Sequence, residues 1–132
     1  MSCYVLNMAK EKRGSAAKSI AAERRSPCPV ACTLDLVGDR WTLLVIRDLF
    51  LGRTRFKDFE ASPEGIPTNI LSERLERLVA AGIVEQAPVD EGAKRLGYKL
   101  TAKGKALAPV LGAIRDWGLK WEKGTRVMAG PG

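Results

Sequence analysis

The fold of this chain is decided by residues 56–104, which read FKDFEASPEGIPTNILSERLERLVAAGIVEQAPVDEGAKRLGYKLTAKG. Leu71, Leu75 and Leu78 are spaced by four and three residues, which predicts one buried stripe along a helix. The other side of this expected helix, residues 67–81, carries Thr68, Asn69, Ser72, Glu73, Arg74 and Arg77. A helix that packs through one face and leaves a polar face free has the form required to enter the major groove of DNA.

The segments on both sides of this helix complete the motif. A short helix is expected over residues 56–60, with Phe56 and Phe59 buried. Two strands are expected after the longer helix, over residues 83–89 and 96–100, joined by a turn that is too long for a two-residue hairpin. Helix, turn, helix and hairpin in this order predict a winged helix-turn-helix, a mainly α fold with a small β hairpin.

Two further helices are expected before this motif. Pro29 can open the first helix, because proline suits a first helical turn. The apolar residues of this helix are Val30, Leu34 and Val37. Asp39 can cap the second helix, over residues 40–51. The inward-facing residues of the second helix are Trp41, Leu44, Val45 and Leu49. A short strand is expected over residues 53–55.

One long helix is expected to close the fold, from Thr101 to about Lys123. Its continuous apolar stripe consists of Leu107, Val110, Leu111, Ile114, Trp117 and Trp121. A helix of about 20 residues is ~30 Å long, which is more than a small domain covers. Its far end is therefore expected to pack against a second copy of the chain, since two-fold dimers are the commonest assemblies. The residues expected at this homodimer interface are Leu107, Leu111, Ile114, Trp117 and Trp121.

Length and charge suggest how the chain is organised. A chain of 132 residues suits one domain, and 22 Lys and Arg against 15 Asp and Glu give a net charge of +7. Residues 1–27 hold six basic and two acidic residues, which contributes +4. This excess fits an anionic partner and a solvated basic tail about equally well. We expect a loosely ordered basic extension over 1–27, a domain over 28–123 that includes the dimerisation helix, and a disordered tail over 124–132.

The chain carries no sequence signal for a membrane. Its longest apolar segment, residues 41–51, is interrupted by Arg47 and Asp48 and is shorter than the roughly 20 residues that a membrane helix needs. Residues 1–8 lack the basic start and the apolar run of a secretory signal. These observations predict a cytoplasmic protein without a membrane partner, in which the three cysteines are thiols.

A series of short motifs carries a family resemblance that covers residues 28 to about 121. The motifs are Cys28-Pro29-Val30, Val37-Gly38-Asp39-Arg40-Trp41-Thr42-Leu43-Leu44, Arg55-Phe56, Gly65-Ile66, Leu71, Arg74-Leu75, Gly82-Ile83-Val84, Tyr98-Lys99-Leu100-Thr101, Gly104 and Trp117. In this order and spacing the chain resembles the HxlR-type (MarR-like) transcriptional regulators. The resemblance implies a dimeric winged-helix DNA-binding regulator without enzymatic activity, with repression as the favoured effect. The turn over residues 90–95 departs from the family, because it lacks the prolines often found there.

Candidate DNA contacts fall into two groups. Base contacts are expected from the polar face of the second motif helix, where Asn can pair with adenine and Ser or Thr can bond several base edges. Phosphate contacts are expected from Arg55, Lys57, Lys94 and Arg95, and Arg53 is left undecided. Arg74 could instead pair with a carboxylate such as Asp58. The alternative for the whole set is that these are ordinary exposed residues that do not contact DNA. The expected partner is double-stranded DNA with a roughly palindromic operator.

Cys28 is the candidate sensor. Several members of the family sense thiol stress at the cysteine before the Pro-Val pair, which here is Cys28. A helix N-terminus lowers the pKa of a thiol, and Arg24 and Arg25 are expected to lower it further. The alternative role for Cys28 is that of a small buried apolar residue without sensing function, which is also the role expected for Cys32. The chain has no histidine, and Cys28 and Cys32 cannot complete a tetrahedral zinc site alone, although a dimer could supply two more thiols. No metal or other cofactor is expected.

Other functions receive less support from the sequence. An enzyme is disfavoured, because no histidine can act as a base, no Gly-rich phosphate loop is present, and a cysteine nucleophile would lack an imidazole partner. A winged-helix module that binds protein stays open, although the polar helix face argues against it. The favoured prediction is a transcription regulator that responds to thiol oxidation, to an electrophile or to a small molecule near the dimer helices or beside Trp41.

Overall fold

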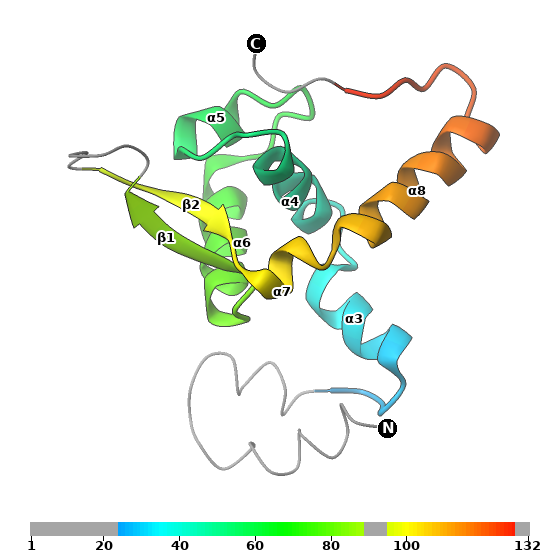
Figure 1. Ribbon diagram of the computed structural model, residues 1–132, viewed down its shortest axis with the longest axis horizontal. Coiled ribbons are helices and arrows are strands. Elements are labelled where there is room, and N and C mark those ends of the chain that lie inside the picture. The colour runs from blue at the N-terminus through cyan, green and yellow to red at the C-terminus, as the bar shows by residue number, and fades with distance from the viewer. Residues whose placement is uncertain (1–23, 89–94, 129–132) are drawn as a thin grey trace.

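The computed structural model describes residues 24–88 and 95–128, which form a mainly helical fold with one small antiparallel sheet at its edge (Figure 1). The elements are α3 (Pro29–Val37), α4 (Thr42–Phe50), α5 (Phe56–Glu60), α6 (Thr68–Ala80), β1 (Val84–Pro88), β2 (Leu96–Leu100), α7 (Ala102–Lys105) and α8 (Ala108–Trp121). The predicted helix-turn-helix followed by a hairpin is therefore confirmed. Within these residues, none of the helices has the length and apolar character to cross a membrane.

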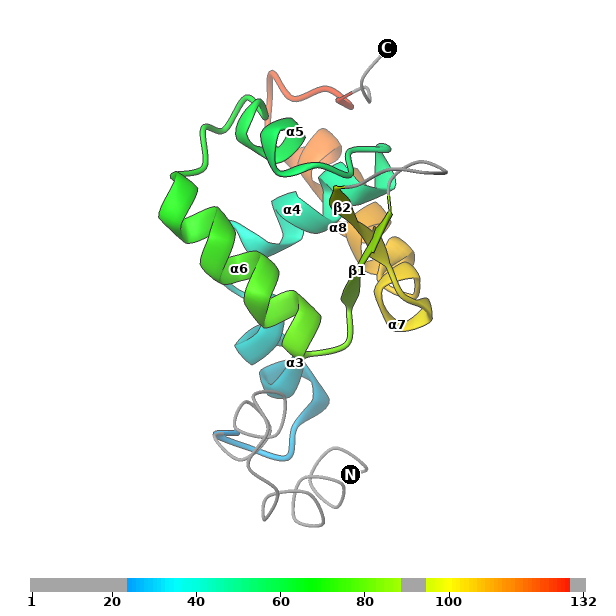
Figure 2. The same cartoon turned by 90° about the vertical axis from the view of Figure 1, so that its left-hand side faces the viewer.

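The core forms where α6 packs against α4. Leu71, Leu75 and Leu78 are 0, 1 and 2% exposed, as their spacing predicts, and they join Val45 and Ile46 of α4 in one apolar cluster. Each such leucine stabilises the fold by about 1.5–3 kcal/mol through burial alone. Figures 1 and 2 show α4 running between α6 on one side and α8 on the other. The position of α6 is thus set by the most deeply buried part of the molecule.

The hairpin forms the wing. Val84 pairs with Leu100 and Pro88 with Leu96 in antiparallel register, and the predicted strand over 96–100 is confirmed. The expected strand over 53–55 is wrong. This segment makes one backbone hydrogen bond to β2, from the Tyr98 N–H to the Thr54 carbonyl at 2.8 Å, and does not form a strand. The turn over residues 89–94, including Lys94, lies outside the described residues.

The single helix predicted from Thr101 to about Lys123 is wrong. The chain forms a short α7 and a separate α8, with a break at Ala106 and Leu107. Pro109 in the first turn of α8 is the physical reason, since its ring would clash with the carbonyl of residue 105 in a continuous helix and it has no N–H to donate. The break allows α8 to leave the wing and extend outward (Figure 1).

The apolar residues of α3 are less buried than their spacing suggests. Val37 is buried, but Val30 and Leu34 are 66% and 53% exposed. Phe56, expected to be buried, is only partly covered. Ile46, which the sequence analysis did not place in the core, is completely buried. Helix α3 therefore presents a largely uncovered apolar face in the single chain.

A close approach at Gly104 joins α7 to the start of the sheet. The Thr101 hydroxyl accepts the Gly104 N–H at 3.2 Å and caps α7. A Cβ at position 104 would fall on the Ile83 carbonyl oxygen, well inside contact distance, and would lie 2.8 Å from Leu100 Cδ2. Because the Ile83 group is backbone, it cannot rotate away.

We predict that Gly104→Ala lowers the free energy of unfolding by about 1–3 kcal/mol, the usual cost of overpacking. Urea denaturation of the full chain measures this change. Gly118→Ala is the matched control, because nothing lies within 4 Å of a Cβ there. It should leave stability unchanged or raise it by up to about 1 kcal/mol. Equal stabilities for the two variants would contradict the proposed clash.

Candidate nucleic-acid interface

The side of α6 turned away from the core is polar and exposed. Thr68, Asn69, Ser72 and Glu73 are all exposed on it. Thr68 donates its hydroxyl to Glu60 at 2.8 Å. Asn69 and Ser72 make no side-chain hydrogen bond within the described part of the chain, so their polar atoms are available to a partner. Figure 2 shows α6 at the periphery of the molecule, with no element covering its outer side.

Arg74 is held within the protein. Its Nε donates to Asp39 Oδ2 at 2.8 Å, and its guanidinium also pairs with Glu73. The suggested pairing with Asp58 is wrong, because Asp58 instead accepts the Arg55 N–H at 3.0 Å and caps α5. The side chain of Arg74 is only 18% exposed, so it serves first to dock α6 against the start of α4.

Asp39 is the centre of this docking contact. It accepts the Trp41 N–H at 3.0 Å and the Thr42 N–H at 3.2 Å, which confirms the predicted cap of α4. Partial burial would raise the pKa of Asp39, but hydrogen bonds from Arg74, Thr42 and Trp41 outweigh burial and hold this pKa well below its ordinary value. The carboxylate is therefore charged at neutral pH.

Arg77 makes a second link between α6 and the segment before α4. Its Nη2 donates to the Asp35 carbonyl at 3.1 Å, and its Nε lies 3.8 Å from Glu73 Oε1. The two arginines of α6 that were predicted as DNA contacts thus have partners inside the chain, whereas Asn69 and Ser72 have none among the described residues. The DNA contacts of all these residues stay predictions.

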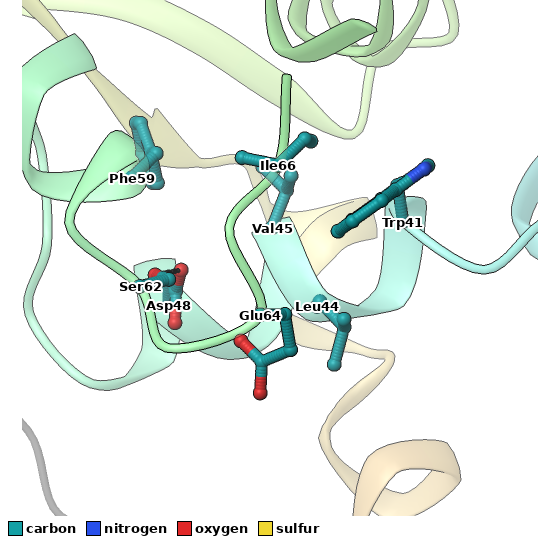
Figure 3. Close-up of a pocket in the computed structure, with 8 residues that line it drawn as sticks. All are labelled: Trp41, Leu44, Val45, Asp48, Phe59, Ser62, Glu64 and Ile66. Carbon is teal, nitrogen blue, oxygen red and sulfur yellow. Dashed lines mark hydrogen bonds between the residues drawn. The ribbon is translucent and has the colours of Figure 1, made fainter. Parts of the chain in front are cut away.

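A buried polar cluster fixes the turn that leads into α6. Asp48 is 3% exposed, pairs with Arg47 at 2.9 Å and accepts the Ser62 hydroxyl. Arg53 Nη1 donates to Ser62 Oγ at 3.1 Å, which gives the undecided Arg53 a structural role. Figure 3 shows Asp48 and Ser62 side by side, with Glu64 on the same turn.

Arg47 extends this cluster to the turn itself. Its two terminal nitrogens each donate to Glu64 at 2.8 Å in a bidentate pair. The hydrogen bond from Arg47 is the main cause of the lowered pKa of Glu64, and Glu64 in turn raises the pKa of Arg47. Sequence reasoning missed this cluster, although two adjacent charges inside an apolar helix were a visible signal.

The small cavity in Figure 3 limits the role of Trp41. It is lined by Trp41, Leu44, Val45, Asp48, Phe59, Ser62, Glu64 and Ile66, and its volume is about 10 Å³. That space suits at most a single water. This cavity cannot hold a small-molecule effector, and Trp41 belongs to the partly buried shell of the core, the role that the sequence favoured for it.

The candidate phosphate contacts lie at the ends of the motif. Arg55 and Lys57 are exposed at the start of α5, and Arg95 is exposed just before β2. Lys94 lies outside the described residues. Lys57 and Arg95 have no ion pair within the described ranges, so their charges are available to an anionic partner.

Cys28 is the N-cap residue of α3 and is exposed. Hydrogen bonds from the Ala31 and Val30 N–H groups lower the pKa of its thiol. The expected contribution of Arg24 and Arg25 is wrong, since these backbone groups account for the lowering and Arg25 pairs with Asp35 at 2.8 Å. Cys32 is buried, as predicted. The part of the chain that is described holds no cluster of three or more potential metal ligands.

The predicted interface residues fall into two groups. Leu107 and Leu111 pack partly against the core. Ile114, Trp117 and Trp121 on the outer part of α8 are 51, 61 and 62% exposed. Helices α8 and α3, which flank the motif, thus each carry exposed apolar residues.

The docked α6, its free polar face and the adjoining hairpin define a winged helix-turn-helix transcription regulator, a DNA-binding protein and not an enzyme. Residues 36–126 match the family described as HxlR-like helix-turn-helix, and the chain belongs to that family.

Curated relatives agree with this assignment. The chain is 40% identical over 88 residues to the uncharacterized HTH-type transcriptional regulator YvaP of Bacillus subtilis, covering 67% of this chain and 82% of that protein. It is 39% identical over 89 residues to the uncharacterized HTH-type transcriptional regulator Rv3095 of Mycobacterium tuberculosis, covering 67% of this chain and 56% of that longer protein.

Solved structures share the fold. The putative transcription factor PA1607 is 41% identical, with a TM-score of 0.72 over 80% of this chain and 75% of its own. The redox regulator HypR in its reduced form is 28% identical, with a TM-score of 0.64 over 73% of this chain and 95% of its own. The quinone-bound YodB of B. subtilis is 33% identical, with a TM-score of 0.59 over 71% of this chain and 99% of its own.

We predict that Asp39→Asn lowers the free energy of unfolding by about 1.5–3 kcal/mol at pH 7, because a charge-assisted bond to Arg74 is lost. The pKa of Asp39 is lower in the folded state than in the unfolded state, where it is about 3.9. The carboxylate therefore contributes its full stabilisation well above pH 3.9 and loses it progressively as the pH falls from there through the folded-state pKa. Urea titrations between pH 7 and pH 2.5 should show the two proteins converging below about pH 4.

Asp116→Asn is the control for this experiment, because Asp116 pairs with Arg115 at 3.0 Å on the exposed side of α8. Its effect should stay within about 0.5 kcal/mol at every pH. A difference between wild type and Asp39→Asn that was independent of pH would contradict the assigned role of the carboxylate.

Proposed function

We propose that this protein is a repressor that binds one operator sequence in double-stranded DNA through α6. The observation that carries the proposal is the division of α6 into two faces. Three leucines fix the helix on the core, while Asn69 and Ser72 remain exposed and have no hydrogen-bond partner within residues 24–88 and 95–128. An asparagine can bond adenine N6 and N7 together, and a serine can bond several base edges. These residues therefore supply sequence choice.

Phosphate contacts supply the affinity. Lys57 on α5 and Arg95 before β2 are exposed and have no ion pair with a described residue, and Arg55 is exposed close to Lys57 in the sequence. Lys94 adjoins Arg95 in the sequence at the wing. Each neutralised phosphate releases counterions, so binding should weaken steeply as salt rises. In this proposal Arg74 and Arg77 mainly orient α6, and Glu73 positions Arg74.

The protein acts as a homodimer in this proposal. Ile114, Trp117 and Trp121 of α8 and Val30 and Leu34 of α3 are exposed apolar residues that a second copy can cover. A two-fold dimer would place two copies of α6 about one DNA turn apart, ~34–36 Å, and would select a roughly palindromic operator. We also propose a cytoplasmic location, as expected from the sequence.

The proposed domain covers residues 28–123, with residues 1–27 as a basic extension that can add nonspecific affinity for DNA. Cys28 is proposed as the sensor. Its exposure and its lowered pKa favour attack by the thiolate on a peroxide or on an electrophile. The likeness to the redox regulator HypR and to the quinone-bound YodB supports this assignment.

We predict that Asn69→Ala weakens binding to a selected operator by about 1–3 kcal/mol, with little change for unrelated DNA. Lys57→Gln should weaken both equally and reduce the salt slope of log K by about 1. Fluorescence anisotropy at several salt concentrations measures both effects. Lys57→Arg is the matched control, because it keeps the positive charge at the same exposed position and should leave the salt slope unchanged.

Two results would contradict this assignment. Equal losses on operator and unrelated DNA for Asn69→Ala would remove its role in base reading. If Lys57→Gln left the salt slope of log K unchanged and the protein bound a protein partner, the protein-interaction module would be favoured.

We predict that a mild oxidant lowers the operator affinity of wild type and not that of Cys28→Ser. Cys32→Ala is the control, because the buried Cys32 thiol should not react, and this variant should respond like wild type. In a protein that retains only Cys28, the rate of alkylation should rise with the thiolate fraction and reach half its maximum below pH 8.5, because the pKa of Cys28 is lower than the ordinary cysteine value of about 8.5. If oxidant still released Cys28→Ser from the operator, the assignment of Cys28 as the sensor would be rejected.

A further inference from the structure

Two neighbouring side chains just before α4 carry hydrogen-bond donors that none of the contacts described above uses. The guanidinium carbon of Arg40 lies 5.1 Å from the centre of the Trp41 ring, within the distance of a cation–π contact. Arg40 is exposed and has no ion pair with an acidic residue in the described ranges. The indole N–H of Trp41 likewise makes no hydrogen bond to a described residue and is open to solvent. A cation and a neutral donor are thus available at one place on the surface.

The Trp41 ring gives Arg40 a fixed surface on which to stack. The ring packs on the core and lines the small cavity with Val45 and Ile66. Figure 3 shows the nitrogen-bearing end of the ring pointing away from that cavity. An arginine that is already stacked on an aromatic ring loses less side-chain freedom when it binds an anion. The contact therefore prepares Arg40 for a partner.

The acidic groups nearest to this pair are already neutralised. Asp39 precedes Arg40, but its carboxylate accepts two N–H groups at the start of α4 and pairs with Arg74. Glu73 pairs with Arg74 as well and lies 3.8 Å from Arg77. Two arginines thus offset these two carboxylates, and the charge of Arg40 remains in excess. This local balance favours an anionic partner.

The pair lies on the side of α6 opposite the wing. One flank of α6 faces the segment before α4, because Arg74 bonds Asp39. The other flank faces the hairpin, where Val79 and Tyr98 line one groove. Residues 74 and 79 are five positions apart, which places them about 140° apart around a helix. The exposed polar face of α6 lies between these flanks, so a duplex on that face has one phosphate backbone near the wing and the other near the start of α4.

We propose that Arg40 and Trp41 together bind one phosphodiester of the DNA backbone, on the border of the major groove opposite the one that Arg95 of the wing contacts. The guanidinium donates to a phosphate oxygen in a charge-assisted bond, and the indole N–H donates to the same phosphate. The wing and this pair then hold the two backbones that border the groove. Because phosphate contacts fix the register of a protein on its duplex, the pair sets how α6 is presented to the bases. This assignment rests on the proposed function.

The test uses operator duplexes in which one phosphate at a time is replaced by a neutral methylphosphonate. Fluorescence anisotropy measures their binding to the full reduced chain. Arg40→Gln should weaken the unmodified operator about tenfold per half-site at 0.1 M salt and lower the salt slope of log K by about 1 per half-site. It should also lose the sensitivity of wild type to methylphosphonate at one position. Arg95→Gln should lose it at a phosphate on the opposite border of the groove.

Two variants separate the charge from the neutral donor. Arg40→Lys is the matched control, because it keeps the positive charge and should keep the salt slope. Trp41→Phe keeps a ring but removes the indole N–H, so it should weaken all DNA about threefold and leave the slope unchanged. Urea denaturation compares the stabilities of the variants. An effect of Arg40→Gln on the structure alone would lower affinity for every duplex equally and would leave the methylphosphonate pattern unchanged.

Three outcomes would overturn the proposal. If wild type binds the operator and Arg40→Gln keeps its affinity, salt slope and methylphosphonate pattern, the phosphate site is rejected and the proposed function stands. If Arg40→Gln dissociates the dimer in sedimentation and keeps the methylphosphonate pattern, Arg40 contacts a second copy of the chain instead of DNA. Failure of wild type to bind any DNA would reject both this site and the proposed function.

Discussion

The attachment of α6 to the core is the constraint on which the rest of this structure depends. Leu71, Leu75 and Leu78 fix where the helix lies, and their near-complete burial leaves it no alternative face to bury. Everything on the other side of the helix is consequently exposed in one defined orientation. Reading of a base sequence requires such an orientation, because bidentate contacts to bases tolerate little rotation of the side chains that make them.

Charged contacts complete what the apolar contacts begin. Apolar burial decides which face of α6 meets the core, but it is non-directional and therefore restrains small shifts of the helix across the core only weakly. The bond between Arg74 and Asp39 and the pairing of Arg47 with Glu64 fix the helix and the turn before it directionally. Separating a partly buried ion pair costs free energy, because each charge is left without its partner. These pairs therefore favour one orientation of α6 over others.

The sequence predicts the parts of this fold that depend on local spacing. The boundaries of α6, the strand over 96–100 and the buried Cys32 follow from periodicity and residue type. The partner of Arg74 could not be predicted, because Asp39 is 35 residues away and only the packing of α6 on α4 brings the two together. The break before α8 could have been anticipated, since Pro109 was visible, but the apolar stripe continued across it.

The most direct measurement of the central claim is selection of genomic double-stranded DNA fragments by the purified reduced protein, with excess competitor DNA. The account predicts recovery of one inverted repeat whose half-sites are centred about 10–10.5 base pairs, or a multiple of this, apart. It also predicts that Asn69→Ala recovers a changed or degenerate half-site. Recovery of fragments without a common sequence, with yields that fall uniformly as salt rises, would contradict the claim that α6 reads DNA.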